Sequence, residues 1–285
     1  SSDLVLEDWD ISSYVEASKT YVLHEEEYVK GHYIAEDLEF TVDLYDPGEI
    51  VIMDMVDKTI CLKARKIDES GNLLEGAVIT LKDNDTDEIV DEWTTVLEEH
   101  DLSEIVVPGH SYTMKEMEVV DGHYIAQDVV FSVNEYGQEE EVIIQDMVDE
   151  TTRLVIKKID DKTGEIVEGV RLKLWDETDP EDITMVSTDE GWLTTKAPIE
   201  LKGIVTGGHQ YRLEESEYVE GVYQATDIIF MLPKEASEEV ISITMVDETT
   251  NTGIRKIDPS GNPVHGARMQ ILDTDGNVVY EWMTD

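Results

Sequence analysis

The sequence repeats itself, and this repetition restricts the fold more than any other feature of the chain. Three kinds of segment recur in a fixed order: a lysine block containing K-I-D, a glutamate block containing Y-x-x-x-E, and a short block ending in M-V-D. The lysine blocks start at Ala64, Lys157 and Ile254, the glutamate blocks at Thr20, Ser111 and Gln210, and the last blocks at Met55, Met147 and Met245. We therefore expect a row of similar small units rather than one large core.

The order of the blocks divides the chain into two whole units and two partial ones. Residues 60–149 and 150–248 contain all three blocks, whereas residues 1–59 lack a lysine block and residues 249–285 contain only a lysine block. When the C-terminus is joined to the N-terminus on paper, the lysine-to-glutamate spacing falls between those of the two whole units. We expect residues 249–285 to be the N-terminal part of a split domain completed by residues 1–59 of the next copy, either a separate chain or another repeat of one longer polypeptide.

The blocks are predicted to form β-strands. Residues 20–28 and 111–119 alternate apolar and polar side chains, which is the period of a half-buried strand. The segments that end in M-V-D are rich in β-branched residues, and turn sequences such as DESGN and DTDGN separate the blocks. The methionines of these segments, Met55, Met147 and Met245, are expected to lie in the core. The expected fold class is all-β, with tandem Greek-key β-sandwich domains joined by short linkers into a rod.

The charge of the chain restricts its partners. Lys and Arg number 21 against 67 Asp and Glu, which gives a formal net charge of −46. Nucleic acid needs a basic surface and is excluded, and anionic membranes are disfavoured. No apolar run is long enough for a membrane span, and no signal peptide is recognisable, so we expect a soluble protein or a fragment of a longer one. Cys61 is the single cysteine, so an extracellular chain would need a stabilising device other than disulfides.

Lysine, glutamate and aspartate recur in one order at nearly fixed spacing. The sets are Lys66, Glu116 and Asp149, then Lys158, Glu215 and Asp247, and, across the split domain, Lys256, Glu25 and Asp57. Burial of a lysine beside an aspartate favours the neutral form of both. A neutral amine is a nucleophile, a protonated carboxyl can be attacked, and a second carboxyl can move protons. The product would be an isopeptide bond. Two alternatives remain open: ordinary surface charges, or a buried pair that does not react.

These motifs resemble a known family. K-x-D-x-x-G-x-x-x-x-G-A, then Y-x-x-x-E-x-x-x-x-x-G-Y, then V-x-M-V-D is similar to the Cna B-type (SpaA-like, prealbumin-like) domains of Gram-positive surface proteins and pili. The resemblance implies prealbumin-like sandwiches in which the lysine of the first strand bonds the aspartate of the last. It assigns the catalytic role to Glu116, Glu215 and Glu25. The acidic neighbours Glu214, Glu26 and Glu27 leave this assignment open by one position, and strand alternation favours the three glutamates that lie four residues after a tyrosine. The second unit departs from the pattern with E-G-V at residues 168–170, and every copy lacks the proline usual before the G-Y element.

The sequence thus predicts a structural extracellular stalk or filament segment, made of self-crosslinking domains that join head to tail. The alternative is an adhesin whose domains bind a host protein or glycan, and an enzyme acting on an external substrate is disfavoured. No cofactor or metal is expected, because the histidines lack metal-ligand spacing and residues 83–88 and 273–277 fit hairpin turns better than calcium loops.

Overall fold

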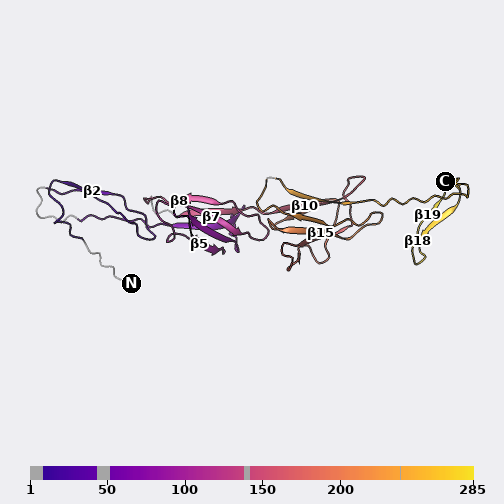
Figure 1. The fold of residues 1–285 in the computed structure, drawn as a ribbon, viewed down its shortest axis with the longest axis horizontal. Coiled ribbons are helices and arrows are strands. Elements are labelled where there is room, and N and C mark those ends of the chain that lie inside the picture. Colours follow the sequence, from indigo (N-terminus) through magenta and orange to yellow (C-terminus); the bar gives the residue numbers. More distant parts are fainter. Residues whose placement is uncertain (1–8, 44–51, 138–141, 238) are drawn as a thin grey trace.

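The computed structural model describes residues 9–43, 52–137, 142–237 and 239–285, drawn as a ribbon in Figure 1. Within these ranges the chain has only strands and loops, and no helix that could span a membrane. The prediction of an all-β chain of sandwich domains is confirmed. Strands β3 to β9 form what we call the first sandwich, and strands β10 to β17 form the second.

The first sandwich has a three-stranded and a four-stranded sheet. The order of the smaller sheet is β6 (His100–Asp101), β3 (Leu62–Asp68) and β9 (Ile143–Asp149). The order of the larger sheet is β5 (Glu88–Thr94), β4 (Val78–Asp83), β7 (Ser111–Glu118) and β8 (Val129–Ser132). The first and last strands of the sandwich, β3 and β9, pair in parallel, while the other pairs are antiparallel.

The second sandwich repeats this arrangement. Its smaller sheet has the order β14 (Ile199–Lys202), β10 (Arg153–Asp160) and β17 (Ile241–Asp247), and β10 and β17 are again parallel. Its larger sheet has the order β12 (Thr184–Met185), β11 (Arg171–Asp176), β15 (Gln210–Glu217) and β16 (Ile228–Met231), with β13 (Trp192–Leu193) also paired to β11.

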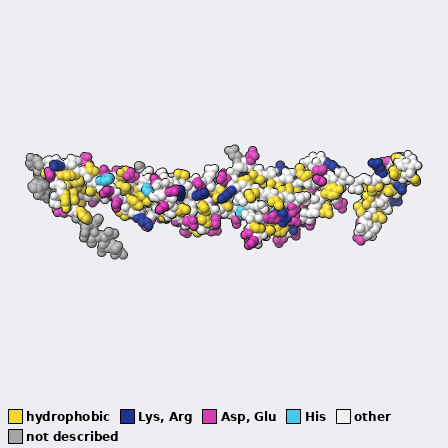
Figure 2. Space-filling view, in the orientation of Figure 1, with side chains coloured by type: hydrophobic (Ala, Val, Ile, Leu, Met, Phe, Trp, Pro, Cys, Tyr) yellow, Lys and Arg dark blue, Asp and Glu magenta, His cyan; other side chains and the backbone are white. Residues whose placement is uncertain are grey.

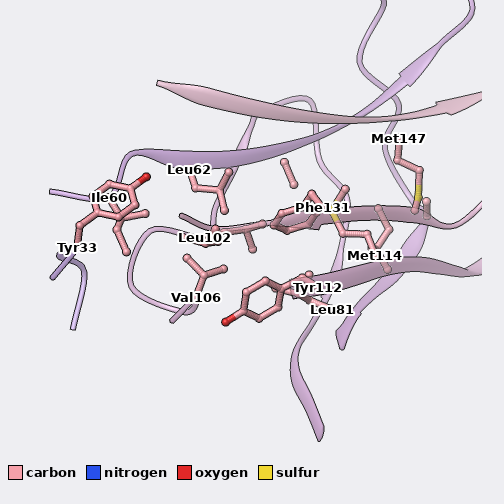
Figure 3. Close-up of a cluster of buried hydrophobic side chains, with 14 residues drawn as sticks. Tyr33, Ile60, Leu62, Leu81, Leu102, Val106, Tyr112, Met114, Phe131 and Met147 are labelled. Atoms are coloured by element: carbon pink, nitrogen blue, oxygen red, sulfur yellow. The ribbon is translucent and has the colours of Figure 1, made fainter. Parts of the chain in front are cut away.

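Apolar side chains that alternate along the strands fill the core between the two sheets. In the first sandwich, Leu62 and Met147 of the smaller sheet meet Leu81, Tyr112 and Met114 of the larger one (Figure 3). All five side chains are buried. Successive side chains of a strand point to opposite faces, so every second residue of these strands lies in the core. The same alternation carries polar residues inward at one end of the sandwich, where the candidate site lies.

Each end of the described chain carries an isolated two-stranded sheet. Strands β1 (Thr20–Leu23) and β2 (Leu38–Thr41) belong to the N-terminal segment, which we define as residues 9–43 and 52–58. Strands β18 (Arg268–Leu272) and β19 (Val278–Met283) belong to the C-terminal segment, residues 249–285. The two pairs lie at opposite ends of the long axis in Figure 1, and both segments expose hydrophobic side chains in Figure 2.

Candidate functional site

A lysine, a glutamate and an aspartate are buried together in the first sandwich. Lys66 follows Leu62 and Ala64 on the inward face of β3, and Asp149 follows Met147 on the inward face of β9. Glu116 follows Tyr112 and Met114 on the inward face of β7, in the opposite sheet. The period of the strands therefore continues an apolar stripe into a polar end on both sheets. All three side chains are fully buried.

The lysine lies between the two carboxyl groups. Lys66 Nζ lies 2.9 Å from Glu116 Oε2 and donates a hydrogen bond to Asp149 Oδ1. Glu116 Oε2 also accepts a hydrogen bond of 2.6 Å from the backbone N–H of Ala126, which fixes its position. The other carboxyl oxygens, Glu116 Oε1 and Asp149 Oδ2, have no hydrogen-bond partner within the described part of the chain.

The charges of this site do not balance when every group is ionised, because one ammonium faces two carboxylates. A buried net charge is costly, so the site favours binding of one more proton. Burial raises the pKa of Asp149 to about 7; Lys66 opposes this shift, and the charge of Glu116 adds to it. A protonated Asp149 near neutral pH is consistent with its unpartnered Oδ2.

The second sandwich holds the same three residue types in the same places. Lys158 of β10 forms an ion pair with Asp247 of β17 and lies 3.4 Å from Glu215 Oε2 of β15. The side chains of all three are fully buried. Glu215 Oε2 accepts a hydrogen bond from the N–H of Ala225, ten residues further on, just as Glu116 does from Ala126.

The third predicted set is divided between the two ends of the chain. Glu25 Oε2 accepts a 2.6 Å hydrogen bond from the N–H of Ala35, so Glu25 has the position of Glu116 and Glu215. Burial, and then the charge of Glu25, raise the pKa of Asp57. Lys256 is exposed in the C-terminal segment. The structure therefore brings Glu25 and Asp57 near each other but does not bring Lys256 to them.

The sequence left the glutamate assignment uncertain by one position, and the geometry distinguishes the neighbours. Glu214 points out of the core and accepts hydrogen bonds from Trp175 Nε1 and Arg212 Nη1. Glu26 and Glu27 are exposed. Alternation along the strand, counted from the tyrosine four residues earlier, selects the inward glutamate.

Sequence reasoning missed a second repeated polar pair. His110 Nδ1 lies 2.7 Å from Asp83 Oδ2, and His209 Nδ1 lies 2.7 Å from Asp176 Oδ2. In both sandwiches the aspartate ends one strand of the larger sheet, and the histidine precedes the strand that pairs with it, β7 beside β4 and β15 beside β11. Asp83 and His110 also belong, with Asp85, to the one group in the described residues whose spacing could suit a metal ion. Their atoms already bond one another and nearby backbone N–H groups, which explains the cluster as turn structure.

The smaller sequence predictions have mixed outcomes. Residues 83–88 and 273–277 form the turns between β4 and β5 and between β18 and β19. Met147 and Met245 are core residues, but Met55 is only half-buried, so its predicted core position is wrong in this chain. Met55 lacks a core because no strand pairs with residues 52–58.

Comparison with known proteins gives the family. The model of the family described as SpaA, prealbumin-like fold domain, matches residues 61–147 and 152–249. No curated protein matches the chain. Similar solved structures include the Bacillus anthracis TIE protein, with 18% identity over 79% of this chain and 41% of that one and a TM-score of 0.36. Shaft pilin SpaA from Lactobacillus rhamnosus GG is 13% identical over 68% of this chain and 98% of that one, with a TM-score of 0.30. A streptococcal ancillary pilin is 17% identical over 80% of this chain and 75% of that one, with a TM-score of 0.29.

The chain spans about two fifths of the TIE protein's length. The assignment therefore rests on the family model, and the resemblance inferred from the repeated motifs is confirmed. Because that model covers both sandwiches and well over half of the residues, the chain belongs to the family of SpaA prealbumin-like fold domains.

Proposed function

We propose that this chain is a structural segment of an extracellular stalk or filament, whose domains each close an amide bond between a lysine and an aspartate. The observation that carries the proposal is the pair of buried triads. In each sandwich a lysine of the first strand and an aspartate of the last strand are in contact, away from water, with a glutamate beside them.

The proposed bond needs no external reagent. The neutral amine of Lys66 attacks Cγ of the protonated Asp149 carboxyl, a C–N bond forms, and one C–O bond breaks. The hydroxyl of the Asp149 carboxyl leaves as water after taking one proton from the amine through Glu116, and the amide nitrogen keeps the other amine proton. Fixed contact between the reacting groups supplies a large effective concentration, and the Glu116 carboxyl can stabilise charge that develops on the carbonyl oxygen. Each site reacts once, so the chemistry is self-modification and not turnover of an external substrate.

Such a bond suits a chain under tension. It would close a loop of 83 residues in the first sandwich. In the chain-entropy account used for disulfides, closing a loop of that size stabilises a domain by about 4–5 kcal/mol. A pulling force would enter along β3, cross at Lys66 and leave at Asp149, so the strands in between would carry little load. This arrangement favours a rod-like load-bearing segment over a catalyst.

We further propose that residues 249–285 begin a sandwich that residues 1–59 of the next copy complete, so that domain boundaries fall near residues 59, 149 and 248. Equivalent bonds support this pairing. In the N-terminal segment, Tyr21 OH accepts a hydrogen bond from the N–H of Glu16, as Tyr112 OH does from the N–H of Val107 in the first sandwich. The N–H of Val264 donates to Lys256 O, as the N–H of Leu74 does to Lys66 O.

The apolar faces of both end segments are open where those of the sandwich are covered. Leu23 is 39% exposed and Ile271 is 40% exposed, whereas Met114 and Leu81, in the corresponding positions, are fully buried. Residues 52–58 and 252–256 lie in no strand, although their counterparts pair as β9 with β3. Two segments without a strand partner and two open apolar faces favour completion by strand addition. A Lys256–Asp57 bond would then link copies covalently.

Intact mass under denaturing conditions tests the internal bonds. We expect the purified chain to be lighter than its sequence by two water molecules, one for each sandwich. A boiled gel tests the junction, since covalent oligomers of the 285-residue chain should form a ladder that disappears with Lys256→Ala. A full unmodified mass would refute the internal crosslinks, and a monomer band alone would refute the covalent junction.

A further inference from the structure

The two end segments also carry charged residues at positions where the complete sandwiches form ion pairs between strands. In the first sandwich, Arg65 of β3 binds Asp146 of β9 through two parallel hydrogen bonds, from Nε to Oδ1 at 2.7 Å and from Nη2 to Oδ2 at 2.9 Å. Both residues lie one position out of the core, and they face each other across the parallel ladder. This two-pronged contact is specific for arginine and carboxylate geometry.

The counterparts of this pair are separated in the chain. Arg255 precedes Lys256 as Arg65 precedes Lys66, and Asp54 precedes Asp57 by the three residues that separate Asp146 from Asp149. Both are exposed. In the described part of the chain neither side chain has a hydrogen bond or an ion pair. The second sandwich has no such pair, because Lys157 there faces Thr244.

A second ion pair follows from the other sheet. Arg171 of β11 contacts Glu217 of β15 at 2.8 Å and Glu190 at 3.6 Å. Its counterpart in the C-terminal segment is Arg268, because the two residues before each arginine make the same hydrogen bonds. The N–H groups of Gly169 and Val170 donate to the carbonyl and hydroxyl oxygens of Thr194. Those of Gly266 and Ala267 donate in the same way to Thr284. The counterpart of Glu217 is Glu27, two residues after Glu25. Arg268 contacts Glu281 at 2.6 Å, and Glu27 is exposed.

We propose that the C-terminal segment of one copy docks on the N-terminal segment of another in a register fixed by two ion pairs, Arg255 with Asp54 and Arg268 with Glu27. This inference rests on the head-to-tail assembly proposed above and adds its recognition code. One pair sits on each sheet of the completed sandwich, so together they fix both the strand register and the orientation of the hairpin. They act before any covalent step, by holding Lys256 at Asp57.

Such recognition matters because the partners repel. Each copy carries a formal charge of −46, and electrostatic repulsion slows the association of like-charged proteins. The C-terminal segment presents Arg255, Lys256 and Arg268 to acidic positions on the N-terminal segment. Locally opposite charges raise association rates and suppress wrong registers.

A charge-reversal cycle in the full chain tests the register. The initial rate of covalent oligomer formation is measured on boiled gels for the wild type, Arg255→Asp, Asp54→Arg and the double variant. We expect each single variant to be at least tenfold slower than the wild type and the double variant to recover most of the rate. Asp54→Arg is the sharper single variant, because it lowers the net negative charge and would speed assembly if only general repulsion mattered.

Lys157→Asp is the matched control, since it makes the charge change of Arg255→Asp at the equivalent strand position of the second sandwich and should leave the rate unchanged. Single variants that assemble at the wild-type rate, or a double variant as slow as the singles, would overturn the register while leaving head-to-tail assembly intact. A wild-type chain that forms no oligomer, either on gels or by sedimentation, would overturn both proposals.

Discussion

Lys66 and Asp149 meet through their side chains although their backbones are not partners. In the parallel ladder Lys66 lies opposite Met147, and Asp149 lies opposite Asp68. The lysine side chain therefore reaches along the ladder to the aspartate on the same inward face. Lys158 and Asp247 repeat this offset, opposite Met245 and Asp160. The offset places the amine against the carboxyl in both sandwiches.

Replacing Lys158 with alanine should remove one crosslink and no more. The adjacent Lys157 is exposed on the opposite face of β10, so Lys157→Ala is a matched control. We expect Lys158→Ala to have lost one water fewer than the wild type in intact-mass measurements, after allowance for the substitution. Lys157→Ala should retain the wild-type deficit. Equal water loss in both variants would contradict the assignment of Lys158.

Replacing Lys66 with alanine should destabilise the first sandwich strongly. The variant loses the loop-closing bond, about 4–5 kcal/mol, and leaves Asp149 and Glu116 buried without a cation. For a domain of this size we expect its unfolding transition to fall by about 15 °C or more in calorimetry. Lys63 lies on the same strand as Lys66 and forms an exposed ion pair with Glu99, so Lys63→Ala should shift the unfolding temperature by only a few degrees. Similar shifts in the two variants would make Lys66 an ordinary charged residue.

The glutamate of each site should be needed for bond formation and not for folding alone. Glu215→Ala removes the carboxyl 3.4 Å from Lys158 Nζ, so we expect folded protein without the mass loss of the second crosslink. Glu214→Ala changes the neighbouring residue, which faces Trp175 and Arg212, and should keep that crosslink. Circular dichroism shows whether both variants are folded. A normal crosslink in folded Glu215→Ala would assign the proton-moving role elsewhere.

Repetition made most of the fold and the site predictable from sequence. Lys66, Glu116 and Asp149 stood out because each recurs, and alternation along the strand placed them inward. It was harder to predict which polar side chains would contact each other across strands. His110 and Asp83 are 27 residues apart in the sequence, and the pairing of β4 with β7 brings them together. The core position predicted for Met55 was wrong, because residues 52–58 pair with no strand in the described part of the chain. Local pattern therefore gave the strands and their faces, while long-range pairing required the structure.

Bond formation in the first sandwich should slow as the pH rises through neutrality. Only a protonated Asp149 carboxyl can lose its oxygen as water, and burial raises the pKa of Asp149 to about 7 from 3.8. The folded, uncrosslinked state therefore binds a proton between these two values that the unfolded chain does not bind. Its stability consequently falls as the pH rises from about 4 to about 7 and is constant above that range. With a pKa near 7, the protonated fraction drops roughly tenfold between pH 6 and pH 8.

The measurement uses a Lys158→Ala chain, isolated unfolded and uncrosslinked, so that only the first sandwich reacts. After dilution into buffer at pH 6 or pH 8, samples are quenched in acid, and the loss of one water is followed by mass spectrometry. We expect the reaction at pH 8 to be about tenfold slower, in line with the change in protonated Asp149. Tryptophan fluorescence reports refolding at the two pH values, which separates slow folding from slow chemistry. A rate that is constant or faster at pH 8, with refolding unchanged, would mean that the protonated carboxyl of Asp149 is not the group that Lys66 attacks.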